Sequence, residues 1–191
     1  MTDAYSPRLD EALRFAAAEF RQKVRKGSGV PYLTHLLSVA ALVGEGGGDE
    51  DQIIAAVLHD WLEDIPSANA ERLTEMFGER VCRIVQACSD CEGEPKPPWR
   101  QRKESYIAHL RDADADIKLV SCADKLHNCR STVTDLRLHG VRVFERFNAK
   151  QAGTLWYYQA LIPALASQGW EHFLLDHLRV EVAELVRLGS V

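Results

Sequence analysis

The sequence has no long apolar run. No stretch approaches the roughly 18 uninterrupted apolar residues that a membrane-spanning helix needs. The opening segment, MTDAYSPRLDEALRF, carries acidic residues and no apolar run of the kind found in export signals. These absences predict a cytoplasmic protein that does not associate with membranes.

The sequence lacks an even set of cysteines that could pair completely. The five cysteines, together with the absence of an export signal, indicate reduced thiols rather than a disulfide framework. Cys88 and Cys91 form a C-x-x-C pair, but no second pair completes a zinc site, and the strand–helix pattern of a thioredoxin-like motif is missing. We therefore interpret this pair as packing on a buried helix face.

Positive charge is not in excess either. The net charge of −5 makes a general surface for a nucleic-acid duplex an unfavourable interpretation. The basic residues are nevertheless clustered in two short segments, Arg21, Lys23, Arg25 and Lys26 in one and Arg100, Arg102 and Lys103 in the other. An acidic protein with two local basic clusters suits a small polyanion better than a duplex.

Helical periodicity is present along nearly the whole chain, whereas alternating strand patterns are almost absent. The 191 residues, 46% of them hydrophobic, fit one domain with a core of its own. We see no linker and no internal repeat. The sequence thus predicts an all-α fold, with residues 1–191 forming a single bundle of roughly eight to ten helices.

Turn and cap residues predict where these helices begin and end. Gly27 and Gly29 should stop the first helix, Asp49 is a natural N-cap for the third, and Pro66 should end it. Ser67 or Asn69 can cap the short helix that follows. The stretch CEGEPKPPW predicts the longest loop and a flap. Helices are expected at about residues 8–25, 33–43, 50–64, 79–89, 100–110, 116–136, 143–165 and 170–188. A further short helix is expected just before Gly78, which ends it.

The segment AAVLHDWLED is the first that indicates chemistry. His59 and Asp60 are adjacent, and Glu63 and Asp64 follow one helical turn later, so all four side chains are expected on the same side of the helix. One imidazole and three carboxylates are costly to bury without a cation or hydrogen-bond partners. An exposed helix end that merely carries acids is the alternative, and the segment alone leaves both interpretations open.

Two further segments favour the metal site. VSCADKLHNCRS places Asp124 and His127 on one face of a largely apolar helix, and PYLTHLLSVA places His35 near the start of another, where a core histidine is the alternative. The resulting set has two imidazole nitrogens and two carboxylate oxygens, from His35, His59, Asp60 and Asp124. Such a set suits a borderline first-row cation such as manganese, with open positions for water.

Four segments in order resemble the hydrolase domain of the Rel/SpoT enzymes, and above all the stand-alone small alarmone hydrolases: R-K-G-S-G-x-P-Y-x-x-H, H-D-x-x-E-D, F-G and A-D-K-L-H-N. The match runs from about Ala16 to Arg130, with looser similarity at Thr154–Tyr158. The resemblance implies a single HD domain built around a metal site. It also implies metal-dependent hydrolysis of the 3′-diphosphate from (p)ppGpp and (p)ppApp, which yields GDP or GTP, or their adenine equivalents, plus diphosphate.

Carried over by position, the resemblance assigns roles to single residues. It implies one divalent cation per chain, usually manganese, with ligands His35, His59, Asp60 and Asp124, and makes Glu63 and Asp64 the catalytic acidic pair. His127 is no ligand in this pattern. The nucleotide contacts that it implies, or places nearby, are Arg25, Lys26, Asn128, Lys103, Lys150 and Thr154. Phe20 stands where relatives often have histidine, so the pocket edge near the base is expected to differ.

Other functions stay open at this point. One is an HD phosphohydrolase for a 5′-nucleotide or for the 2′-phosphate of NADPH, and another is a non-catalytic HD module that binds an alarmone. The pair of Glu63 and Asp64 weighs against the second, and the acidic charge balance weighs against a third, a DNA-binding helical protein. The sequence does not decide between guanine and adenine, and it leaves a homodimer open.

Overall fold

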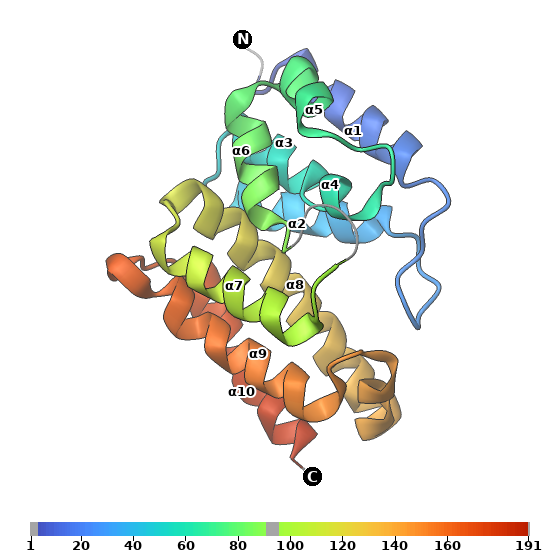
Figure 1. The fold of residues 1–191 in the computed structure, drawn as a ribbon, viewed down its shortest axis with the longest axis vertical. Helices are drawn as coiled ribbons and strands as arrows, with labels where there is room; N and C mark the ends of the chain where they lie inside the picture. Colours follow the sequence, from blue (N-terminus) through green and yellow to red (C-terminus); the bar gives the residue numbers. More distant parts are fainter. Residues whose placement is uncertain (1–3, 91–95, 191) are drawn as a thin grey trace. The chain divides into compact units, whose positions relative to one another are not determined.

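The computed structural model describes residues 4–90 and 96–190 (Figure 1). Within these two stretches the secondary structure is helical, and the only β pairing is an isolated bridge between Val24 and Pro31. The prediction of an all-α fold is confirmed. No helix in the described parts of the chain is long and apolar enough to cross a membrane.

Backbone contacts divide the chain into two compact units, Met1–Glu92 and Gly93–Val191. The helices of the first are α1 (Pro7–Glu19), α2 (Leu33–Glu45), α3 (Glu50–Leu58), α4 (Trp61–Asp64), α5 (Ala70–Phe77) and α6 (Glu79–Cys88). α3 packs against α1, α2 and α6, and its residues from Ile54 to Leu58 are fully buried. The core of this unit therefore surrounds α3. The single domain over residues 1–191 stays a prediction.

The expected caps of the first unit are confirmed where they depend on local chemistry. Asp49 caps α3 through a capping box, in which its side chain accepts from the N–H of Gln52 and the Gln52 side chain accepts in return. Asn69 caps α5 by accepting from the N–H of Arg72. Gly78, with φ of 91°, separates α5 from α6.

The first helix ends earlier than predicted, at Glu19 instead of near Arg25. The chain then turns, and Val24 pairs with Pro31 in the isolated bridge, supported by a 2.8 Å hydrogen bond from the N–H of Arg25 to the carbonyl of Val30. Backbone pairing across this loop replaces the helical bonds that the expected helix would have made. We call residues 24–31 the basic loop, because it carries Arg25 and Lys26.

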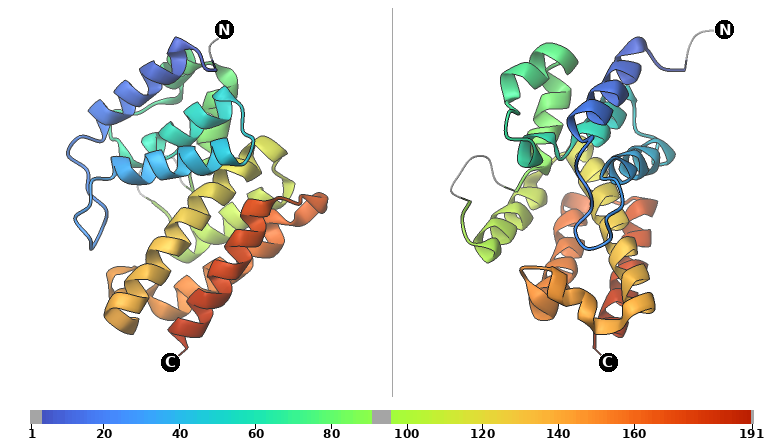
Figure 2. Two further views of the ribbon diagram at one scale, coloured as in Figure 1. Left: turned by 180° about the vertical axis from the view of Figure 1, so that it is seen from behind. Right: turned by 90° about the vertical axis from the view of Figure 1, so that its right-hand side faces the viewer.

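The helices of the second unit are α7 (Trp99–Asp112), α8 (Ala115–His139), α9 (Lys150–Leu165) and α10 (Phe173–Gly189), with short 3-10 helices η1 (Gly140–Arg146) and η2 (Ser167–Gly169). α8 and α10 run side by side in the same direction (Figure 2), and ion pairs from Arg130 to Glu181 and from Arg137 to Glu184 join them. α9 packs between α7 and α10, since it contacts both.

The predicted helix over residues 143–165 is wrong in its first turns. Gly140, at φ of 68°, ends α8, and the chain continues as η1 before α9 begins at Lys150, whose φ of 54° is unusual for a residue with a side chain. The other three α-helices of this unit, α7, α8 and α10, begin and end within about three residues of the expected positions.

The cysteines fit the packing interpretation as far as the structure describes them. Cys82, Cys88, Cys122 and Cys129 are buried free thiols, and burial raises the pKa of Cys122 and of Cys129 to about 12. Cys91, the second cysteine of the C-x-x-C pair, lies outside the described residues, as does most of the predicted flap.

Candidate functional site

His59 and Asp60 lie at a break between α3 and α4, so the prediction of one continuous helix to Asp64 is wrong. His59 is the C-cap of α3, and its Nδ1 lies 2.7 Å from the carbonyl oxygen of Ala56. That carbonyl belongs to the last turn of α3, where backbone carbonyl groups no longer have an N–H donor from the same helix. The side chain thus caps its own helix, and the chain is redirected at Asp60.

The same contact determines the state of the His59 ring. A carbonyl only accepts hydrogen bonds, so Nδ1 carries a hydrogen, and in the neutral ring Nε2 keeps the lone pair. This Nε2 lies 3.1 Å from Oδ2 of Asp60. Metal-ligating histidines are commonly held in this way, with the second nitrogen bound to a backbone carbonyl.

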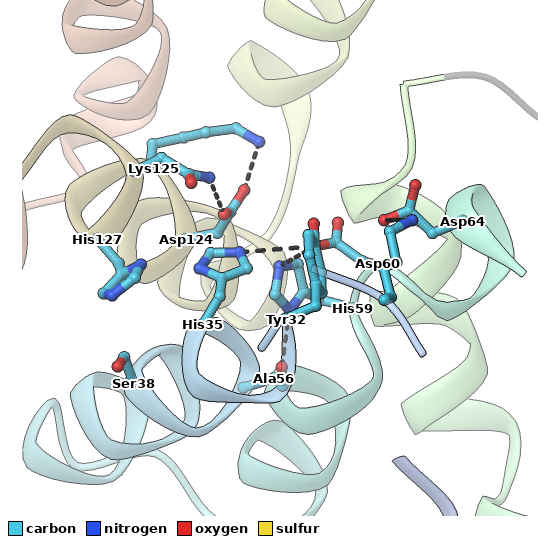
Figure 3. A network of polar contacts seen from close by, with 12 residues as sticks. Tyr32, His35, Ser38, Ala56, His59, Asp60, Asp64, Asp124, Lys125 and His127 are labelled. Carbon is cyan, nitrogen blue, oxygen red and sulfur yellow. Dashed lines mark hydrogen bonds and ion pairs between the residues drawn. The ribbon is translucent and has the colours of Figure 1, made fainter. Parts of the chain in front are cut away.

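His35, on α2, faces the same carboxylate oxygen, with its Nε2 at 3.5 Å from Oδ2 of Asp60. The rings of His35 and His59 are 5.1 Å apart at 74°, and one nitrogen of each lies within 4.8 Å of the other. Both histidines are 1% exposed. Two nitrogens and one carboxylate oxygen therefore converge (Figure 3), a group that needs a shared proton or a cation to be stable when buried.

Tyr32 is a residue of this group that sequence reasoning did not single out. Its hydroxyl donates a 2.6 Å hydrogen bond to Oδ2 of Asp60. Its ring stacks on Phe20 at 5.6 Å and meets the edge of His35 at 5.5 Å. A signal was present, because Tyr32 precedes His35 by three residues and such residues share a helix face.

The predicted acidic pair lies on α4, and both side chains are partly exposed. Asp64 forms an ion pair of 2.6 Å with Lys23. Burial raises the pKa of Asp64 above its usual value, the negative charge of Asp60 raises it further, and Lys23 acts in the opposite direction. Asp64 is therefore a carboxylate whose proton affinity is increased, as general acid–base chemistry requires.

Arg25 and Lys26 lie on the basic loop and not on a helix, and Lys26 is exposed. The loop returns directly to Tyr32, whose N–H donates to the carbonyl of Lys23 at 2.9 Å. The two predicted nucleotide contacts thus lie on a loop that leads directly into Tyr32, the residue that donates a hydrogen bond to Asp60.

Asp124, on α8 of the second unit, is a buried carboxylate held by two neighbours on its own helix. Its Oδ1 accepts from the amide of Asn128 at 2.6 Å, and its Oδ2 accepts from the ammonium of Lys125 at 2.5 Å (Figure 3). Burial alone would lower the pKa of Lys125, but the charge of Asp124 outweighs it and the pKa lies well above its usual value. Both oxygens of Asp124 thus have a donor on α8 itself, and the ammonium of Lys125 balances its charge.

The remaining predicted contacts of the second unit lie on α7 and α9. The ammonium of Lys103 lies 4.9 Å from the centre of the Tyr157 ring, and Thr154, which is buried, donates to the carbonyl of Lys150 at 2.7 Å. The amine of Lys150 is exposed and donates to the carbonyl of Glu145 at 3.2 Å. The structure therefore brings Lys103 to α9 but turns Lys150 toward the preceding 3-10 helix.

Comparison with known proteins gives a consistent family. Residues 12–155 match the HD domain family. The guanosine-3′,5′-bis(diphosphate) 3′-pyrophosphohydrolase MESH1 of Danio rerio is 37% identical over 125 residues, 64% of this chain and 67% of the relative. The bifunctional (p)ppGpp synthase/hydrolase SpoT of Escherichia coli K12 is 30% identical over 166 residues, but these make up 84% of this chain and only 21% of the longer relative.

Solved structures show the same fold. The structure of a metazoan orthologue of SpoT, described as hydrolysing ppGpp and as having a role in starvation responses, superposes with a TM-score of 0.75 and 26% identity, covering 97% of both chains. The structure of lmo0812 from Listeria monocytogenes EGD-e superposes with a TM-score of 0.70 and 24% identity, covering 78% of this chain and 96% of that one. The second likeness concerns the fold alone.

Proposed function

The chain belongs to the HD domain family, and from this premise we propose that it is a hydrolase that removes the 3′-diphosphate from guanosine 3′,5′-bis(diphosphate). The relatives MESH1 and SpoT carry this activity in their names. The observation that carries the proposal is the convergence of His35 and His59 on the carboxylate of Asp60. We extend the proposal to the adenine alarmone (p)ppApp, because nothing in the sequence selects one purine.

We propose one divalent cation, manganese, as the cofactor, with ligands His35, His59, Asp60 and Asp124. The donors fit the ion, since imidazole nitrogen and carboxylate oxygen suit a borderline first-row cation. In the first unit, the tautomer of His59 directs a lone pair at Asp60, and in the second, Asp124 is a buried carboxylate held by Lys125 and Asn128. Such a cation lowers the pKa of a bound water and polarises a phosphoryl oxygen.

The protein's own residues supply the remaining chemistry in this proposal. Asp64, whose pKa is raised by burial and by the charge of Asp60, takes up the proton of the attacking water, and Glu63 orients that water. Lys23 holds Asp64 in place through their ion pair.

Cationic and polar residues bind the nucleotide in this proposal. Arg25, with its planar guanidinium, stacks on the base or binds a phosphate in a fork, and Lys26 attracts phosphate as a mobile charge. The contacts proposed from the second unit are Asn128, Lys103, Lys150 and Thr154. Together they offset the negative charge that the carboxylates of the site present to a polyanion.

A substrate panel tests the proposal. Purified protein is incubated with manganese and with ppGpp, ppApp or NADPH, and the products are separated by chromatography. We expect diphosphate and GDP from ppGpp. Turnover of NADPH alone would instead identify an HD phosphohydrolase of different specificity, and binding of ppGpp without turnover would identify a non-catalytic module. The cytoplasmic location that the sequence predicts would be checked by fractionation, and the homodimer that the sequence leaves open would be checked by sedimentation.

A further inference from the structure

Tyr157, on α9, carries a buried hydroxyl that has no hydrogen-bond partner among residues 4–90 and 96–190. The side chain is 7% exposed, so water does not solvate it freely. A buried polar group without a partner pays the full cost of desolvation, and phenylalanine would fill nearly the same space without that cost. A hydroxyl in this position is available to a partner beyond the described residues, and a bound ligand is one such partner.

The surroundings hold the Tyr157 ring in a fixed orientation. The rings of Trp99 and Trp156 lie 6.1 Å and 6.4 Å from it, and the ring of Tyr158 lies at 5.8 Å. The ammonium of Lys103 lies over the ring face at 4.9 Å. Because these neighbours restrict the ring, its hydroxyl is oriented before any ligand binds, which lowers the entropic cost of forming a hydrogen bond.

The charges around Tyr157 indicate which kind of partner it takes. The ammonium of Lys103 approaches it from α7, over the face of its ring. A hydroxyl donor on a ring that already holds an ammonium group suits an anionic acceptor such as a phosphate oxygen, because hydrogen bonds to an ionised acceptor are stronger than those to a neutral one. An apolar ligand group would leave the hydroxyl without a partner.

Tyr157 also lies one helical turn after Thr154, on the same face of α9. Thr154 and Lys103 are among the nucleotide contacts proposed above, so three residues of α7 and α9 share one surface. We propose that the Tyr157 hydroxyl donates a hydrogen bond to a phosphate oxygen of the bound nucleotide and is a specificity-determining residue of this enzyme. This inference rests on the proposed function.

Tyr106 provides a matched control. It is also buried, at 4% exposed, but its hydroxyl donates to Oγ of Ser121 at 3.1 Å within the same unit. The variants Tyr157→Phe and Tyr106→Phe remove the same atom from the same residue type. Tyr106→Phe removes a hydrogen bond that is already present without a ligand, whereas Tyr157→Phe does not. A structural role should therefore lower thermal stability, and a ligand-binding role should weaken binding instead.

Three measurements on manganese-loaded protein separate these roles: thermal unfolding without ligand, the stabilisation caused by GDP or by inorganic pyrophosphate, and steady-state kinetics with ppGpp. We expect Tyr157→Phe to unfold at the wild-type temperature or above, with kcat nearly unchanged and KM raised roughly 10-fold or more. It should lose stabilisation by at least one of the two products, which identifies the phosphate that it contacts. Tyr106→Phe should unfold at a lower temperature with an unchanged KM.

A wild-type KM and wild-type stabilisation by both products in Tyr157→Phe would overturn the inference. So would a loss of thermal stability like that of Tyr106→Phe without a change in KM, because the hydroxyl would then serve the fold. If the wild-type protein does not hydrolyse ppGpp, the proposed function fails. The thermal stabilisation caused by GDP or pyrophosphate then tests Tyr157 independently of turnover. If the wild type is stabilised and Tyr157→Phe is not, phosphate binding by Tyr157 is supported. If neither compound stabilises the wild type, phosphate binding is ruled out.

Discussion

The hydroxyl of Tyr32 donates a 2.6 Å hydrogen bond to Oδ2 of Asp60, the same oxygen that the Nε2 atoms of His35 and His59 face. A bond of this kind fixes which lone pairs of the carboxylate remain for other partners. Tyr32 itself is held by stacking on Phe20 at an interplanar angle of 9°. Phe20 thus supports the residue that orients Asp60.

We therefore expect Tyr32→Phe to weaken the metal site while keeping the stack on Phe20. Removing a group that orients a ligand typically costs about 10–100-fold in metal affinity or activity. Manganese titration by calorimetry and kcat measured at saturating manganese check this expectation. Tyr5→Phe, at a tyrosine that is 53% exposed, is the control and should match the wild type. Wild-type manganese affinity in Tyr32→Phe would contradict the orienting role.

Metal removal should stop turnover, and manganese should restore it. Asp60→Ala and Asp124→Ala should each abolish activity while circular dichroism remains helical, because one missing ligand prevents binding without removing a helix. Thermal stability should fall in metal-free protein, since metal affinity contributes to the free energy of folding. Asp176→Ala, which breaks only a surface ion pair with Arg179, is the control. Full activity of metal-free protein would rule out the proposed cofactor.

Substitutions in the acidic pair on α4, Glu63 and Asp64, distinguish a catalytic protein from a binding module. Glu63→Gln and Asp64→Asn keep the size of each side chain and remove its charge. Nucleotide and manganese should still bind, whereas kcat should fall by about 10²–10⁴-fold, the range of general acid–base catalysis. Single-turnover kinetics together with equilibrium binding measure both effects. If both variants turn over normally, these carboxylates have a structural role.

The sequence predicted most helix ends in the first unit because their causes are local. Asp49, Asn69 and Gly78 act within a turn of the helix they cap, and such residue types are recognisable without tertiary information. The two errors there have non-local or competing causes. The bridge between Val24 and Pro31 replaces a helical turn, and the bond from His59 to Ala56 ends α3.

The candidate site was predictable in its residue types but not in its contacts. The motifs identified His35, His59 and Asp60 as ligand candidates. The bond from Tyr32 to Asp60 joins residues 28 apart on different elements, and no periodicity encodes such a pair. The hydrogen bonds of Asp124 with Lys125 and Asn128 lie within one helix. Even so, the spacing of residues along a helix does not predict which of several neighbouring side chains will bond to a carboxylate.

The ion pair between Lys23 and Asp64 predicts a pH effect. Lys23 lowers the pKa of Asp64, against burial and the charge of Asp60, which raise it. Lys23→Met removes the lowering contribution, so the pKa of Asp64 should rise. If Asp64 acts as a base, less of it is ionised at acidic pH, and the acidic limb of kcat/KM should move to higher pH. Arg21→Met, which removes an exposed charge nearby, should leave the profile in place.

An unchanged acidic limb in Lys23→Met, with Asp64→Asn still inactive, would show that the ionisation of Asp64 does not control the rate. The variant should also be checked by thermal unfolding, because Lys23 contacts the ring of Tyr32 at 5.0 Å. A lower unfolding temperature alone does not shift a pH limb, so the two readouts distinguish a structural effect from an electrostatic one.

Arg25 and Lys26 are adjacent on the basic loop, yet they should respond differently to substitution. If Arg25 stacks on the base, Arg25→Lys should be a poor replacement, because an ammonium neither stacks as a plane nor forms a fork. If Arg25 only attracts phosphate, lysine should restore much of what alanine loses. Lys26→Ala, at an exposed side chain, should weaken all polyphosphate substrates alike and leave the base preference unchanged.

The measurement is kcat/KM for ppGpp and ppApp across Arg25→Lys, Arg25→Ala and Lys26→Ala. A stacking role predicts that the ratio of the two substrates changes in both Arg25 variants, because stacking energy depends on the base. Lys26→Ala then serves as the matched control from the same loop, with a loss common to both substrates. Wild-type behaviour of Arg25→Lys on both bases would exclude stacking, since lysine preserves only the charge, and base selection would then lie outside the basic loop.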